Sequence, residues 1–190
     1  MMSLIDLDDP GMLVLPTHRI LFNLDPSVLA MLTPEHLGQF FTVQNIDTSM
    51  TGNASLQRLQ QEQGTAMLLA TPQGMILLTL NEQGAQRMHE SGHSEAWNGL
   101  DVAVAQRLIL EDMLGLSAAD MAAGTYLRYV RDADQALQAV QTGEAQLAIM
   151  LNATRVRQIC DVAEADDRMP QKSTYFYPKL ITGLVMNPLW

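Results

Sequence analysis

Two apolar runs joined by a four-residue turn constrain the fold of this chain more than any other feature. The runs cover residues 65–70 and 75–80, and the link between them reads Thr-Pro-Gln-Gly. Pro at the second turn position and Gly at the fourth are typical of a type I turn, so the pattern predicts a β-hairpin. Because both runs are apolar almost throughout and do not alternate, we expect both faces of the hairpin to be covered.

The strongest helical pattern covers residues 100–114 and ends before Gly115. Leu100, Leu108 and other apolar residues recur at helical spacing along one side of this segment. The pattern predicts the central core helix, and its most deeply buried residues are expected to be Val104, Leu108 and Ile109.

Local start and stop signals place the shorter elements. Asp25-Pro26 and Thr33-Pro34 each combine an N-cap acceptor with a Pro that needs no amide partner, and residues 117–120 resemble a capping box. Further helices are expected over residues 53–63, 134–141 and 154–164. Strands are expected over residues 2–7, 12–21, 40–46, 125–131, 145–151, 173–178 and 181–186. Gly84, Gly92 and Gly99 interrupt residues 84–99 and disfavour a helix there. We therefore expect this segment to form a polar loop.

The chain has 190 residues, of which 47% are hydrophobic, so it is long and apolar enough to bury one core. Strands and helices alternate irregularly, and several links have hairpin length. These features predict a single α+β domain over residues 1–190. Its sheet should have about eight strands, mixed or largely antiparallel, with helices packed on it.

Charge and cysteine content narrow the function classes. Lys and Arg number 11 against 21 Asp and Glu, for a formal charge of −10. This balance argues against nucleic-acid partners and against binding to an anionic membrane. No run approaches the length of a membrane span, and the acidic N-terminus does not resemble a signal peptide. The single cysteine, Cys160, fits a buried position in a reducing compartment, so we expect a cytoplasmic protein.

One literal motif, His89-Glu90-Ser91-Gly92-His93, spells the H-E-x-x-H pattern of zinc peptidases. That pattern works on a helix, where both imidazoles lie one turn apart and the Glu activates metal-bound water. Glu111 is a conceivable third ligand. Ser91 and Gly92 are poor residues for a helix interior, so a loop without bound zinc is the preferred interpretation, and a zinc hydrolase is a distant third hypothesis.

Other signatures are absent. The sequence has no phosphate-binding Walker loop, no dinucleotide-binding glycine motif and no nucleophile elbow, so it points to no particular cofactor. Asp6, Asp8 and Asp9 form an acidic cluster, but they match no known calcium or magnesium loop.

Two segments concentrate polar and basic residues against this acidic background. The first contains His18 and Arg19, and the second runs from residue 169 to residue 179. Together they could form an anion site, because Arg and Lys supply charge while Ser and Thr hydroxyls supply neutral donors. The alternative is an irregular strand pair whose polar groups satisfy one another. The candidate ligand-binding residues are His18, Arg19, Lys172, Ser173, Thr174, Tyr175, Tyr177 and Lys179.

These two segments carry a family resemblance. Residues 9–19, and residues 168–180 with 182–185, resemble motifs of the bacterial and archaeal domain-of-unknown-function family 1015. Family members look roughly twice this length, and their first half ends in a segment of the form Asp-Gly-His-His-Arg. That segment is similar to one in the ParB and sulfiredoxin-like superfamily, in which some members handle nucleotides or transfer phosphoryl groups. The resemblance implies that this chain is the C-terminal half of a longer protein.

Two functional hypotheses follow. In the first, the chain is the ligand-binding or active-site-completing half of an enzyme that acts on an anionic small molecule, for example a phosphorylated one. In the second, it is a non-catalytic interaction module, and the same segments dock the missing N-terminal half or a second copy of the chain. The first hypothesis is favoured if the segment at residues 17–19 and the segment at residues 172–179 line one pocket. If they lie far apart, both segments have structural roles.

Overall fold

A six-stranded antiparallel sheet forms the centre of the computed structural model, which describes residues 6, 9–47 and 49–179. The strand order is β3-β5-β4-β7-β2-β6, and every neighbouring pair is antiparallel. The strands are β2 (His18–Leu21), β3 (Phe41–Ile46), β4 (Ala66–Thr71), β5 (Gly74–Leu80), β6 (Leu127–Val130) and β7 (Leu147–Leu151). With a separate two-stranded sheet, the described residues form eight strands, which confirms the predicted α+β class and its largely antiparallel sheet.

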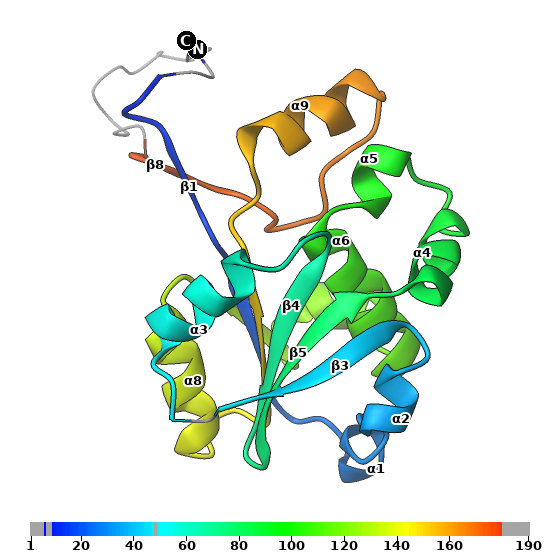
Figure 1. Cartoon of the computed structure of the whole chain (residues 1–190), viewed down its shortest axis with the longest axis vertical. Helices are drawn as coiled ribbons and strands as arrows, with labels where there is room; N and C mark the ends of the chain where they lie inside the picture. Colours follow the sequence, from blue (N-terminus) through cyan, green and yellow to red (C-terminus); the bar gives the residue numbers. More distant parts are fainter. Residues whose placement is uncertain (1–5, 7–8, 48, 180–190) are drawn as a thin grey trace, which may run out of the picture.

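Helices cover both faces of the main sheet, as Figure 1 shows. One face packs on α3 (Gly52–Gln60) and α8 (Ala133–Gln141), with Ile20, Leu68 and Ala148 in the core between them. The other face packs on the central helix and on several shorter helices. These shorter helices are α1 (Pro26–Leu29), α2 (Pro34–Leu37), α4 (Glu82–His89), α5 (Glu95–Asn98) and α7 (Ala118–Ala123). The central strands β4 and β7 are therefore buried on both sides, as their unbroken apolar sequence predicts.

The central helix begins as α6 (Asp101–Val104) and continues with π-type hydrogen bonds as η1 (Ala105–Met113). Val104, Leu108 and Ile109 are fully buried, which confirms the predicted apolar stripe. The π-type winding was not predicted. A π-helix has wider turns than an α-helix, because each amide donates to the carbonyl five residues earlier. The last such hydrogen bond runs from Leu114 N to Ile109 O, at 2.9 Å.

The predicted helix starts are confirmed by side-chain caps. Asp25 accepts from the Ser27 amide and Thr33 from the His36 amide, while Ser117 and Asp120 form a reciprocal capping box. Each cap satisfies a backbone donor that has no partner inside its helix.

Residues 84–99, expected to form a polar loop, instead contain α4 and α5. Gly84 lies inside α4, where a Cβ would overlap the Phe40 carbonyl oxygen. This glycine therefore permits close packing of the helix on the segment before β3 and does not interrupt the helix. The contact joins segments far apart in the sequence, which is why local propensity gave the wrong element.

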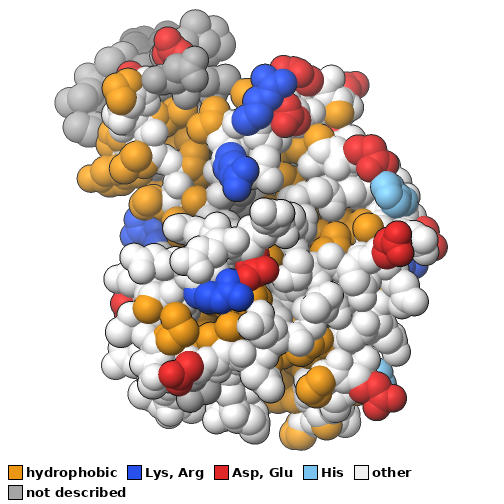
Figure 2. Space-filling view, viewed as in Figure 1, with side chains coloured by type: hydrophobic (Ala, Val, Ile, Leu, Met, Phe, Trp, Pro, Cys, Tyr) orange, Lys and Arg blue, Asp and Glu red, His pale blue; other side chains and the backbone are white. Residues whose placement is uncertain are grey.

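The run over residues 12–21 also differs from the single strand that was expected. It divides at Pro16-Thr17 into β2, which enters the main sheet, and β1 (Leu13–Leu15). β1 pairs with β8 (Tyr175–Tyr177) in a two-stranded arm that leaves the body beside α9 (Val156–Glu164) (Figure 1). Hydrophobic side chains gather on this arm in Figure 2. Apart from Asp6, the strands expected over residues 2–7 and 181–186 lie outside the described residues.

Among the helices that the structure describes, none is long and apolar enough to cross a bilayer.

Candidate functional site

A cavity of about 480 Å³ brings together the two polar segments that the sequence singled out. Thr17 lines it from the start of β2, and Lys172, Thr174 and Tyr175 line it from the segment before and within β8. The opposite wall comes from α7 and the edge strand β6. We call this space the basic cavity. Its polar lining residues are Thr17, Arg128, Tyr129, Arg131, Gln171, Lys172, Thr174 and Tyr175.

Cations dominate the electrostatics of the basic cavity. Arg128, Arg131 and Lys172 line it, and none of the described residues that line it is Asp or Glu. Arg131 and Lys172 make no ion pair within the described part of the chain, and Arg128 makes only a 4.0 Å contact with Glu144. A chain of net charge −10 thus carries a small region of positive potential.

Aromatic rings contact both arginines of the basic cavity and the nearby Lys179. The Arg131 guanidinium carbon lies 4.5 Å from the centre of the Tyr175 ring, and the Lys179 ammonium lies 4.2 Å from the same centre. Arg128 lies 4.5 Å above the ring of Phe22. Cation–π contacts of this kind orient a charged head and leave its N–H groups available to a ligand.

Arg19, a predicted ligand residue, lies buried behind the wall of the basic cavity. Its side chain donates to the Thr17 carbonyl oxygen and lies 5.6 Å from the centre of the Tyr129 ring, and both of these partners line the cavity. Burial lowers the pKa of Arg19 to about 10, so the group stays charged at neutral pH. Arg19 therefore adds to the positive potential of the cavity without lining it.

His18, also predicted to bind ligand, is fully buried and makes a structural contact. Its Nδ1 accepts a hydrogen bond from the Leu151 amide at 3.3 Å. Burial, and then the neighbouring charge of Arg19, lowers the pKa of His18 to about 4. The ring is therefore neutral at physiological pH and ties β2 to the end of β7.

The remaining predicted residues are divided between the interior and the surface. Ser173 is buried, and its carbonyl oxygen accepts from the Thr154 hydroxyl at 2.9 Å. Tyr177 is 51% exposed on the arm, and Lys179 is exposed above Tyr175. The structure thus places Lys172, Thr174 and Tyr175 in the basic cavity and leaves Ser173 and Tyr177 outside it.

Sequence reasoning missed the two arginines of the cavity. Arg128 and Arg131 lie three residues apart among apolar and aromatic residues in Tyr126-Leu127-Arg128-Tyr129-Val130-Arg131. In a chain with few basic residues, two arginines within the strand expected over residues 125–131 are the signal that could have identified them. A second available signal is that the only lysines of the chain are Lys172 and Lys179.

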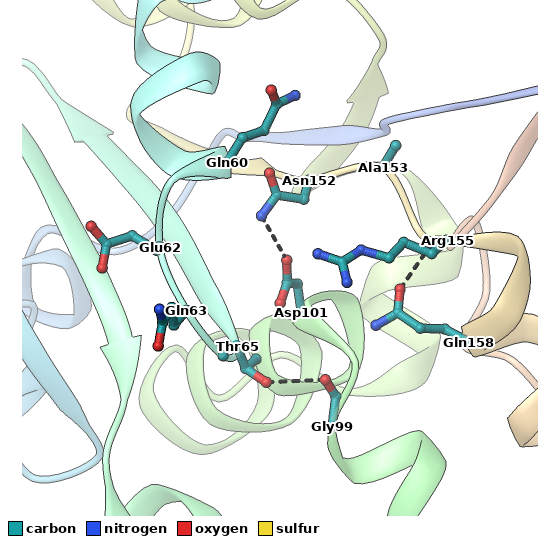
Figure 3. A pocket seen from close by; sticks show the side chains of 11 residues that line it. Gln60, Glu62, Gln63, Thr65, Gly99, Asp101, Asn152, Ala153, Arg155 and Gln158 are labelled. Carbon is teal, nitrogen blue, oxygen red and sulfur yellow. Dashed lines mark hydrogen bonds between the residues drawn. The ribbon is translucent and has the colours of Figure 1, made fainter.

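A second, larger cavity of about 680 Å³ lies where α3 ends, β4 and α6 begin, and the β7–α9 loop passes (Figure 3). We call it the polar cavity. At its base, Asp101 accepts hydrogen bonds from the Ala66 amide and from the Asn152 side chain, each at 3.2 Å. Burial raises the pKa of Asp101 to about 6, although these hydrogen bonds and the nearby charge of Arg155 favour the ionised form. No sequence motif pointed to this cavity.

The H-E-x-x-H residues do not lie on one helix. α4 ends at His89, Glu90 is its C-cap, and Gly92 adopts a left-handed backbone conformation before His93. His89 contacts Glu95 at 2.8 Å, whereas His93 contacts Asp167 at 3.1 Å and stacks on Trp97. Among the described residues no group of three or more His, Cys, Asp or Glu side chains could hold a metal ion, and Glu111 instead contacts Gln106 and Arg107.

A comparison with models of known protein families shows to which family this chain belongs. The model of the family described as a protein of unknown function, DUF1015, matches residues 1–103, which is more than half of the chain. The chain belongs to the DUF1015 family. The DUF1015 match includes the resemblance seen at residues 9–19, whereas residues 168–185 lie outside the matched stretch. A comparison with curated proteins finds no match.

Solved structures share the fold of this DUF1015 chain. A conserved hypothetical protein from Pyrococcus furiosus gives a TM-score of 0.52 at 13% identity, over 90% of this chain and 59% of that one. Two structures of a free serine kinase in complex with AMP, one of them a mutant, each give a TM-score of 0.51. Their identities are 11% and 13%, over 90% of this chain and 56% of theirs. At these identities the similarity shows a shared fold and nothing more specific. The chain spans 56–59% of the length of these proteins.

Proposed function

We propose that this chain is the ligand-binding half of a larger DUF1015 enzyme that acts on an anionic, phosphorylated small molecule. In this proposal the basic cavity binds the phosphate group, and the chemical step requires the other half of the protein. The observation that supports the proposal is the lining of the cavity, in which the described residues include Arg128, Arg131 and Lys172 and no Asp or Glu.

The donors of the cavity suit a tetrahedral oxyanion. An Arg guanidinium offers a planar fork that can bind two phosphate oxygens, while Lys172 offers a point charge. The hydroxyls of Thr17 and Thr174 supply neutral donors from two sides. A phosphate would relieve the repulsion among cations that, within the described residues, have no close acidic partner.

The fold comparison supports a phosphorylated ligand in a general way. One solved structure with this fold is a kinase in complex with AMP, which is itself a phosphorylated small molecule. Because this chain spans 56% of the length of that protein, we propose a shared activity only for a longer protein that contains this half.

The proposal is tested by isothermal titration calorimetry with inorganic phosphate, AMP and 3-phosphoglycerate. The test variant is Arg131→Gln combined with Lys172→Gln, both at exposed positions. The matched control is Arg157→Gln, because Arg157 is exposed on α9, pairs with Asp161 and does not line the cavity.

We expect at least one of the phosphorylated compounds to bind the wild type and the control equally. Binding to the double variant should be weaker by about tenfold or more, since hydrogen bonds to charged groups contribute roughly 1.5–3 kcal/mol each. Equal affinities for the control and the double variant would remove the basic cavity as the site.

A second candidate function, an interaction module, is favoured by the exposed arm. Leu13 and Tyr177 are paired across β1 and β8 and are 52% and 51% exposed. An apolar pair of this kind suits a docking face for the rest of the family protein or for a second copy. Light scattering after size-exclusion chromatography tests self-association: the wild type should dimerise, and the Leu13→Ser, Tyr177→Ser variant should be monomeric. A monomeric wild type would remove the second copy as the partner.

A further inference from the structure

The polar cavity contains hydrogen-bonding capacity that the described residues do not use. Its volume of about 680 Å³ falls within the range of small-molecule sites, and its walls come from three separate segments of the chain, residues 60–65, 99–101 and 152–158. Asp101, Asn152 and Arg155 point toward one another at its centre in Figure 3, with Gln158 beside them.

Acceptors without donors lie at the base of this cavity. The Asn152 side-chain nitrogen donates to Asp101, but its Oδ1 is buried and has no hydrogen-bond partner among the described residues. A buried carbonyl without a hydrogen-bond partner is destabilising, so a ligand donor there would be stabilising. The Asp101 carboxylate accepts one bond on each oxygen and retains further lone pairs.

Donors without acceptors lie on the opposite wall. Gln158 uses its Oε1 to accept from the Arg155 amide at 2.9 Å, which leaves its NH₂ group for other partners. The Arg155 side chain is exposed, and its guanidinium makes no ion pair or hydrogen bond within the described part of the chain. The cavity thus offers acceptors on one side and donors on the other.

The charges at the centre select against ionic ligands. Asp101 repels an anion and Arg155 repels a cation, and the two lie close enough for the Arg155 charge to act on the Asp101 carboxyl. The other carboxylate of the cavity, Glu62, is already paired with Arg58. Neutral groups that both donate and accept, namely hydroxyls, satisfy this arrangement without a charge penalty.

We propose that the polar cavity binds a neutral polyhydroxylated molecule, such as a monosaccharide or a cyclic polyol, through adjacent hydroxyls. One hydroxyl donates to Asp101 and the next donates to Asn152 Oδ1. Their oxygens accept from Arg155 and Gln158. This site is separate from the basic cavity, because no described residue lines both.

The test is saturation-transfer NMR followed by calorimetry with myo-inositol and ribose at concentrations up to about 50 mM, since weak sites have millimolar affinity. The test variants are Asp101→Asn and Arg155→Met. The control is Arg157→Met, two residues further along at an exposed position outside the cavity. Arg155 is exposed, so its variant should keep the fold even if Asp101→Asn does not.

We expect one of the two polyols to bind the wild type, the Arg157 control and the Arg131→Gln, Lys172→Gln variant equally. For both cavity variants, Asp101→Asn and Arg155→Met, the affinity for that polyol should fall by about tenfold or more. Binding of neither polyol, or binding that Arg155→Met leaves unchanged, would overturn the inference without touching the phosphate proposal. Phosphate competing with the polyol would also overturn it.

Discussion

The buried carboxyl of Asp101 should make stability depend on pH in a way that a single substitution removes. Burial raises its pKa from the ordinary value of 3.8 to about 6, so the folded protein holds this proton more tightly than the unfolded chain. The resulting stabilisation is fully present below about pH 4 and is lost as the pH rises through about 6. A gap of about two pKa units corresponds to about 3 kcal/mol.

The substitution Asp101→Asn makes the position permanently neutral. The new amide oxygen can still accept from the Ala66 amide, which Asp101 now binds at 3.2 Å. If the Asn152 amide turns over, its unpartnered Oδ1 accepts from the new NH₂ group. We therefore expect the free energy of unfolding of the variant, minus that of the wild type, to rise by about 3 kcal/mol from pH 4 to pH 8.

Urea denaturation followed by tryptophan fluorescence measures this difference, because Trp97 is buried in the core. The control is Asp166→Asn, at an exposed position with positive φ that suits Asn. It removes an exposed carboxylate that does not line the polar cavity, so it measures the effect of losing one surface charge. A difference for Asp101→Asn that stays constant within about 0.5 kcal/mol would mean that the carboxyl is solvated. It would refute the description of the polar cavity.

Three further predictions concern the core, the packing of α4 and the H-E-x-x-H segment. Leu108→Ala should lower the free energy of unfolding by about 2–5 kcal/mol, since Leu108 is fully buried, and a loss below about 0.5 kcal/mol would contradict its place in the core. Gly84→Ala should destabilise by about 1–3 kcal/mol in urea denaturation despite the better helix propensity of Ala, because the Cβ would overlap the Phe40 carbonyl oxygen; a stabilised variant would disprove that close contact. Elemental analysis should find no stoichiometric zinc, and zinc lost on substitution of either His89 or His93 by Ala would revive the hydrolase hypothesis.

Local signals in the sequence account for most of the elements that were predicted correctly. The caps at Asp25, Thr33 and Ser117 act over two or three residues, so the sequence alone specifies them. The same holds for the hairpin of β4 and β5, whose turn chemistry and apolar runs are contiguous.

Long-range contacts account for the elements that were not predicted. From the sequence alone, Gly84 is expected to disfavour a helix. In the structure it lies inside α4, because the Phe40 carbonyl packs against it and leaves no room for a side chain. The run over residues 12–21 reads as one strand, because the partner that draws Leu13–Leu15 away lies about 160 residues later in the chain.

Only part of the basic cavity could be predicted, because some of its residues are brought there by long-range strand pairing. Lys172 and Thr174 stand in a segment whose polar composition is visible in the sequence. Arg131 joins them only because β6 pairs with β2 at the sheet edge, next to the residues that precede β8. His18 and Arg19 look accessible in the sequence, but the pairing of β2 between β6 and β7 buries both.

An NMR titration of the isotope-labelled protein with inorganic phosphate tests the assignment of the basic cavity as the phosphate site. Amide resonances should shift in a saturable manner at Thr17, at residues 128–131 and at residues 171–175, which surround the basic cavity. Residues 99–101 and 152–158 around the polar cavity should not shift. Saturable shifts confined to the polar cavity, or no saturable shift anywhere, would contradict the assignment of the basic cavity as the phosphate site.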